Sequence, residues 1–113
     1  MNKATEPPPW FGYSIVLQFN FGSDPRTGVC DLLIRLAQHE APGSRTISIL
    51  FEGVAGLSVK DFGGGLTQLL CLAVEDIRDQ QLDRINYVVT DKERDALKLS
   101  CRAFRIVEEG LVS

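Results

Sequence analysis

The clearest pattern of hydrophobic and polar positions in the sequence is an alternation over Thr46–Phe62. From Ile47 to Val59, apolar or small residues occupy the odd positions, whereas polar residues occupy most of the even positions. A period of two residues is typical of a half-buried strand, and the β-branched residues and glycines of this stretch disfavour a helix. We therefore expect two consecutive strands in one apolar phase, with a kink between Gly53 and Gly56.

Three other stretches alternate in the same way. Tyr13–Phe21 predicts a strand that ends at the turn residues Gly22–Pro25. Ile85–Val89 and Leu97–Cys101 predict the two strands of a hairpin with a charged connection. The apolar positions change phase after Ala103, so we expect a β-bulge in the second strand of this hairpin.

Two stretches, 28–41 and 66–78, fit a helix and a strand equally well, because their apolar residues recur at both spacings. The pattern as a whole predicts a mostly β protein, a single-domain antiparallel sheet or sandwich of about six strands. Either ambiguous stretch could instead form a helix, and the fold class would then be α+β. We place a flexible, proline-rich lead-in at residues 1–9 and a single β-rich domain at residues 10–113.

Composition changes this picture only by excluding some classes of protein. The chain has 113 residues, of which 44% are hydrophobic and 24% are charged, as is usual for a globular domain. It contains no run of apolar residues long enough to span a bilayer, and its N-terminus lacks the apolar region of a signal peptide. We therefore expect a cytoplasmic protein that does not bind membranes.

No catalytic, metal-binding or cofactor-binding motif is found in the sequence. Gly63–Gly65 lacks the spacing of a phosphate-binding loop and predicts a sharp bend. His39 is the only histidine, which leaves too few ligands for a metal centre. Cys30, Cys71 and Cys101 are too widely spaced for a metal knuckle and predict buried thiols in a reducing compartment. We predict a protein that is not an enzyme and uses no metal or cofactor.

Acidic residues are concentrated in one segment. Seven acidic and four basic residues lie between Glu75 and Asp95, so this segment accounts for the whole net charge of −3. If these side chains share a face, they form a negative patch that would attract a basic partner; the alternative is an ordinary solvated surface. The residues that we expect to contact a partner are Asp76, Asp79, Asp83, Asp91 and Glu93, with Trp10 as an aromatic anchor.

Several short segments between Thr46 and Ile106 resemble a known family. These segments are Phe51–Val54, Val59–Gly65, Val74–Ile77, Gln81–Leu82, Asn86–Tyr87 and Ser100–Phe104. The chain resembles small bacterial immunity proteins of polymorphic toxin systems. The resemblance implies a mostly β cytoplasmic protein that is encoded beside a toxin and neutralises it by direct binding. It also implies that both ambiguous stretches are strands, and it supplies no active-site motif.

Three hypotheses about function remain open from the sequence. The first is a non-enzymatic immunity protein whose acidic face binds a cognate toxin and competes with the anionic ligand of that toxin. The second is an intracellular adaptor or assembly domain that forms homo-oligomers through an open sheet edge. The third, a small hydrolase, is disfavoured because no nucleophile and base can be assembled. Nucleic acid is not expected as a partner, because the sequence has no basic patch.

Overall fold

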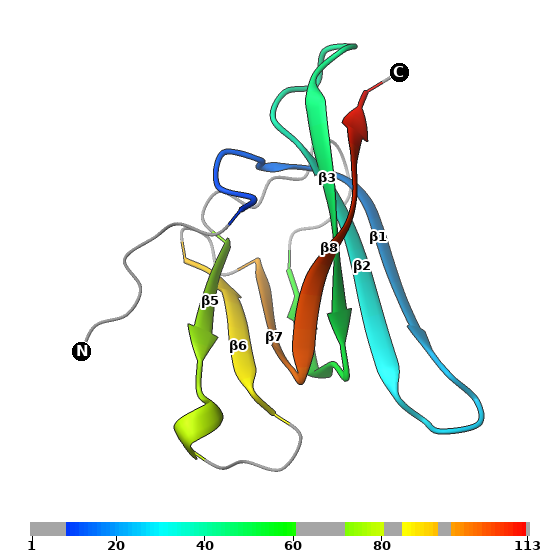
Figure 1. Cartoon of the computed structure of the whole chain (residues 1–113), viewed down its shortest axis with the longest axis vertical. Helices are drawn as coiled ribbons and strands as arrows, with labels where there is room; N and C mark the ends of the chain where they lie inside the picture. Colours follow the sequence, from blue (N-terminus) through cyan, green and yellow to red (C-terminus); the bar gives the residue numbers. More distant parts are fainter. Residues whose placement is uncertain (1–8, 61–71, 81–84, 93–95, 113) are drawn as a thin grey trace.

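The computed structural model describes residues 9–60, 72–80, 85–92 and 96–112, which form two antiparallel sheets of four strands each (Figure 1). The first sheet has the order β1 (Ile15–Ser23), β2 (Cys30–Ala37), β3 (Arg45–Glu52) and β8 (Ala103–Leu111). The second has the order β4 (Ala55–Val59), β7 (Leu97–Cys101), β6 (Tyr87–Asp91) and β5 (Leu72–Asp76). A short 3-10 helix, η1 (Arg78–Gln80), follows β5. The mostly β fold predicted from the sequence is confirmed.

The described residues contain eight strands rather than about six, because both ambiguous stretches contribute a strand and the bulged strand expected from Leu97 onward is two strands, β7 and β8. The stretch 28–41 contains β2, in which buried leucine and isoleucine side chains alternate with more exposed ones. The described part of 66–78 contains β5 and the start of η1. Residues 61–71, including Gly63–Gly65 and Cys71, lie outside the described residues, so the bend expected there stays a prediction.

The kink expected between Gly53 and Gly56 is confirmed, and it takes the chain from one sheet to the other. Gly53 and Gly56 have φ angles of 66° and 63°, a left-handed conformation that glycine adopts without steric cost. The chain enters the second sheet as β4, which pairs with β7. β3 and β4 are therefore consecutive strands of two different sheets.

The phase change after Ala103 has a different cause from the predicted bulge. The β6–β7 hairpin forms as expected, but the chain then leaves the second sheet at Arg102 and enters the first sheet as β8. The Arg102 amide donates to the Glu52 carbonyl oxygen (2.9 Å), so this crossing lies against the crossing at Gly53. A β-carbon on Gly53 would lie 3.0 Å from that of Arg102. The two crossings form one corner, which we call the Gly53–Arg102 corner.

One hydrophobic core lies between the two sheets. Leu32, Ile34 and Leu36 of β2 face it from the first sheet, and Leu97 and Leu99 of β7 face it from the second; all five side chains are at most 1% exposed. Because side chains from both sheets exclude water from the same volume, burial of this core stabilises the sheets together.

The central strand β3 is buried on both faces, although its alternation predicted one exposed face. Thr46 and Ser48, on the face away from the core, are each only 3% exposed. Thr46 is paired with Gly110 of β8, which has no side chain, so the two strands lie close together at this point. The Arg35 guanidinium donates to the Thr46 hydroxyl at 3.5 Å. Short side chains beside a long arginine explain why polar residues are buried here.

The predicted lead-in, residues 1–9, lies outside the described residues except for Pro9, which begins a turn. The Tyr13 amide closes this turn by donating to the Trp10 carbonyl oxygen at 2.9 Å. In the described ranges, no helix combines the length and the apolar character that crossing a membrane requires.

Candidate partner-binding site

The acidic segment divides between the surface and the interior of the second sheet. Glu75 and Asp76 end the edge strand β5 and are exposed, and Asp79 is exposed on η1. We call these three residues, with Arg78, the β5–η1 end. Asp83 and Glu93 lie outside the described residues. The predicted contact residues that the structure brings together at the surface are therefore Asp76 and Asp79.

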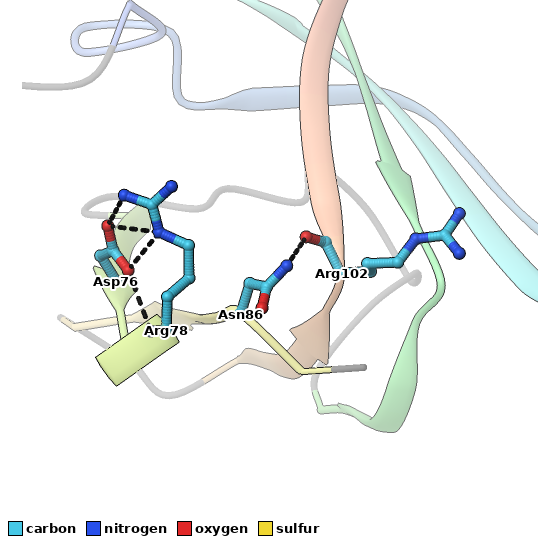
Figure 2. A network of polar contacts seen from close by, with 4 residues as sticks. All are labelled: Asp76, Arg78, Asn86 and Arg102. Carbon is cyan, nitrogen blue, oxygen red and sulfur yellow. Dashed lines mark hydrogen bonds and ion pairs between the residues drawn. The ribbon is translucent and has the colours of Figure 1, made fainter. Parts of the chain in front are cut away.

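Asp76 is held in place by the arginine two residues later (Figure 2). The Arg78 Nε donates to both carboxylate oxygens of Asp76, at 3.0 and 3.1 Å, and the Arg78 Nη2 donates to Oδ2 at 2.6 Å. The Arg78 backbone amide also donates to Oδ1 at 3.0 Å, so the carboxylate caps the turn into η1. This bidentate geometry orients the Asp76 carboxylate, and the positive charge of Arg78 offsets the negative charge of Asp76.

Arg78 also contacts the neighbouring strand. Its guanidinium carbon lies 5.7 Å from the centre of the Tyr87 ring, a cation–π distance. The hydrogen bond and the charge of Asp76 raise the pKa of Arg78 above its ordinary value, so the arginine stays charged at every physiological pH. Among the described residues of the β5–η1 end, Arg78 pairs with Asp76, and the exposed carboxylates of Glu75 and Asp79 add further negative charge beside this pair.

Asn86 fastens the start of β6 to the Gly53–Arg102 corner. Its side-chain amide donates to the Arg102 carbonyl oxygen at 2.8 Å, and its backbone amide donates to the Cys101 carbonyl oxygen at 3.0 Å. Figure 2 shows the Asn86 amide facing the Arg102 carbonyl, while the Arg102 side chain points away. The Asn86 carbonyl oxygen accepts from the Ile77 amide at 2.8 Å, which connects the corner to the β5–η1 end.

A hollow of about 470 Å³ lies beside β5 and β6. Glu75 and Asp76 line it on one strand, and Val88 and Thr90 line it on the other; Lys92, just after β6, lines it as well. The hollow is large enough for a side chain of another protein, and its two acidic residues outnumber its one lysine, which favours a basic side chain.

Asp91 lies in the interior, which removes it from any contact surface in this conformation. It is 1% exposed, because its position in β6 faces the core with Val89. Its Oδ2 accepts from the Ala96 backbone amide at 3.2 Å, across the connection from β6 to β7. Counting charges along the sequence could not distinguish this structural carboxylate from the exposed ones, whereas the alternation of β6 could have.

Trp10, the expected anchor, is likewise inside the protein. It is 2% exposed, and its indole Nε1 donates to the Leu72 carbonyl oxygen of β5 at 2.9 Å. Its ring packs edge-on against Phe51 and Phe104 of the first sheet, at centroid distances of 6.4 and 5.6 Å. Trp10 thus joins the N-terminal turn to both sheets, and a tryptophan with a satisfied N–H and aromatic neighbours is typical of a core.

The remaining candidate residues are one histidine and two cysteines, and their surroundings are typical of residues that support the fold. The backbone amide of His39, an exposed residue, donates to the Ser44 hydroxyl at 2.9 Å. Cys30 and Cys101 are free thiols, and burial raises the pKa of Cys101 to about 11, which keeps it protonated. Within the described ranges, no three histidine, cysteine or acidic residues lie together as a metal site would require.

Sequence reasoning missed the Asp76–Arg78 contact and the role of Asn86. An acidic residue at the end of a strand with a base two residues later is a local signal that could have predicted the first. Nothing local could have predicted the second, because Asn86 and Arg102 meet only through the β6–β7 pairing.

Comparison with known protein families gives a match over most of the chain. A family model described as Immunity protein PIM8 matches residues 8–107. No curated protein and no solved structure matches the chain significantly. The matched region contains every strand completely except β8, whose last residues lie beyond it.

Proposed function

The chain belongs to the PIM8 family of immunity proteins, and from this premise we propose that it neutralises a cognate bacterial toxin by binding it directly, without catalysing a reaction. The observation that carries the proposal is the family match, which spans residues 8–107 of a 113-residue chain. The protein acts in the cytoplasm, where it protects the cell that makes the toxin. It needs no cofactor, and neither nucleic acid nor a membrane is its partner.

The surface that binds the toxin is the β5–η1 end. Asp76 and Asp79 are the described members of the predicted contact set that are exposed, and Glu75 adds a third carboxylate beside them. Exposed acidic side chains attract a basic surface over several ångströms and steer it during the encounter. Asp83 and Glu93 belong to the same proposed surface, whereas Asp91 and Trp10 support it from the interior.

A basic side chain of the toxin occupies the hollow beside β5 and β6. Glu75 and Asp76 line that hollow and supply the opposite charge, while Val88 and Thr90 contact the aliphatic part of an arginine or lysine. A toxin that cleaves or modifies nucleic acid has such side chains at its active site, because they bind phosphates. The immunity protein would then prevent substrate from entering.

The test is binding of the toxin, identified by capture from the host at low salt, to two charge-reversed variants. Asp79→Lys changes the β5–η1 end, and Glu40→Lys makes the same change in charge at an exposed residue of the β2–β3 connection. In Figure 1 these two places lie at opposite ends of the molecule. Neither substitution removes a buried side chain, so both variants should fold.

We expect Asp79→Lys to slow association about 3- to 10-fold at low salt, and we expect this difference to disappear in high salt. Glu40→Lys should bind at the wild-type rate, because its charge lies far from the proposed surface. Equal slowing in both variants would mean that only net charge matters, and an unchanged rate in both would rule out the β5–η1 end. Failure to capture any toxin under conditions that keep the protein folded would contradict the immunity function itself.

A further inference from the structure

The four edge strands of the two sheets differ in how they are protected from pairing with another chain. In the strand order of the described residues, β1 and β8 are the edges of the first sheet, and β4 and β5 are the edges of the second. An edge strand has unpaired backbone groups on one side, and natural proteins usually protect them with charged residues, proline or a short strand.

Three of these edges carry such protection. β4 and β5 have only five residues each, and β5 ends in Glu75 and Asp76. β8 has nine residues, and Arg105, Glu108 and Glu109 are exposed along it. Any strand that added to one of these edges would be short or would bring charges together.

β1 is the exception. Its nine residues, Ile15–Ser23, include no charged residue and no proline. Leu17 and Phe21 are 42% and 47% exposed on it, and Gln18 and Asn20 are exposed between them. A register shift between Val16 and Gln18 interrupts the pairing with β2 near its start, but the pairing is regular from Gln18 to Ser23. Among the described strands, only β2 pairs with β1. From Gln18 onward, the other edge of β1 lacks the protection that the three other edges have, so another strand could add there.

We propose that two copies of this protein associate through β1, in antiparallel pairing about a two-fold axis near Asn20. The arrangement joins two four-stranded sheets into one sheet of eight strands by main-chain hydrogen bonds. It places Phe19 of one copy beside Phe21 of the other, and aromatic cross-strand pairs stabilise antiparallel sheets. An axis near Asn20 uses the part of β1 whose backbone is regular.

The charges near β1 favour a second copy in this orientation. Asp24 and Arg26 lie at the end of the β1–β2 hairpin and form an exposed ion pair of 3.6 Å. Antiparallel pairing places them near Val16 and Ser14 of the other copy, which are uncharged. Parallel pairing would instead place each of these two residues beside the same residue of the other copy, so that like charges meet. A C2 pair of identical uncharged strands therefore desolvates no charge.

This dimer is independent of toxin binding and leaves the proposed toxin surface accessible. β1 and β5 are edges of different sheets and lie on opposite sides of the molecule in Figure 1. Each copy in the dimer could therefore bind a toxin, giving a complex with two copies of each protein. A protein that remains monomeric would overturn the dimer and leave the immunity function unaffected.

The first measurement is the mass of the full chain by sedimentation velocity over a range of concentrations. We expect a shift from the monomer mass of 12.5 kDa toward twice that value. A contact limited to one strand edge is small for a specific interface, so the midpoint of the monomer–dimer transition should lie at a protein concentration of about 1–100 μM. A monomer mass that persists to about 1 mM would overturn the proposal.

Charged variants then show whether β1 is the interface. Gln18→Lys/Asn20→Lys and Gln18→Glu/Asn20→Glu change exposed positions only, so neither double variant removes a core contact. We expect each one alone to weaken the dimer at least about 10-fold, because like charges meet across the axis. Mixing the two variants should restore the dimer mass, because opposite charges then meet.

A control variant places the same charges on a different edge. Val107→Lys/Leu111→Lys changes two exposed residues of β8, which are 41% and 61% exposed, and should leave the dimer mass unchanged. The fluorescence of Trp10, the single tryptophan, confirms in every variant that the core is intact. If the β1 variants dimerise like wild type, or if the mixture stays monomeric, β1 is not the interface. A loss of toxin binding in the β1 variants of a monomeric protein would instead identify a toxin strand as the occupant.

Discussion

The Gly53–Arg102 corner and the β5–η1 end are both polar parts of this protein, but they are built from different groups. At the corner, the backbone takes part in each contact: the Arg102 amide donates to the Glu52 carbonyl oxygen, and the Gly53 amide donates to the Asp31 carboxylate at 3.2 Å. A β-carbon on Gly53 would lie only 3.0 Å from that of Arg102. At the β5–η1 end, exposed side chains pair: the Arg78 and Asp76 side chains are 62% and 33% exposed. Figure 2 shows the Asp76–Arg78 pair and, separately, the contact by which the Asn86 side chain reaches the Arg102 carbonyl oxygen at the corner.

This difference separates stability from binding. Backbone contacts at a closely packed corner fix where the chain changes sheets, so removing them affects the whole fold. An exposed ion pair contributes little to stability, because water and salt screen it. Its side chains can change without loss of the fold, which suits a surface that must match a particular toxin.

The largest effect is expected at the corner, from Gly53→Ala. An alanine there must keep a φ of 66° and place its β-carbon 3.0 Å from that of Arg102. We expect a loss of about 3 kcal/mol in the free energy of unfolding, from backbone strain and from the clash. Trp10 fluorescence during denaturation by urea measures it.

Gly56→Ala is the matched control for this prediction. Gly56 has a φ of 63°, but no atom of the described residues lies within 4 Å of the β-carbon that it would gain. Gly56→Ala should lose only about 1 kcal/mol in the free energy of unfolding, from backbone strain alone. Equal losses in the two variants would show that close packing at the corner contributes nothing.

The next largest effect concerns Asp91, the acidic residue that lies inside. Asp91→Ala removes the acceptor of the Ala96 amide and leaves that buried donor without it, so we expect a loss of about 2 kcal/mol in the free energy of unfolding. Asp91→Asn keeps an oxygen at the same place and should lose less. If both variants are as stable as wild type but fail to bind toxin, Asp91 is a contact residue after all.

A smaller effect follows from the buried thiol of Cys101. Burial raises its pKa from 9.0 to about 11, so the folded protein holds the proton over a range of pH in which the unfolded chain loses it. The stabilisation is complete below pH 9 and is lost as the pH rises toward 11, by about 2 kcal/mol at most. Urea denaturation at several pH values measures this loss. Since lysines and tyrosines titrate there too, the loss is the difference between wild type and Cys101→Ala, whose curve should be flatter.

The sequence predicted the β fold because alternation is a local property that the two-residue period of a strand imposes directly. It identified β2 only with the help of the family resemblance, because leucines and alanines in Gly28–Ala41 fit both periods. The crossing at Arg102 was visible as a change of phase, but the phase alone cannot distinguish a bulge from a change of sheet. That distinction depends on the pairing of β8 with β3, which joins residues far apart in the chain.

The candidate site was less predictable than the fold. Charge along the sequence located the acidic segment, and Asp76 and Asp79 are indeed exposed. It could not show that Asp91 faces the core or that Arg78 engages Asp76, since both depend on side-chain direction. Trp10 was assigned to the surface because nothing local indicates that the Leu72 carbonyl would be its partner.

The smallest effect is expected at the β5–η1 end, and Figure 2 contains both the variant and its control. Arg78→Ala removes an exposed ion pair, so we expect no measurable change in the urea midpoint. Asn86→Ala removes the donor to the Arg102 carbonyl and should cost about 1 kcal/mol. Toxin association should show the opposite order: Arg78→Ala should speed it at low salt by removing a positive charge from the acidic surface, and Asn86→Ala should leave it unchanged. If Arg78→Ala instead lowers the urea midpoint more than Asn86→Ala does, the β5–η1 end is part of the structural framework, and the separation of stability from binding fails.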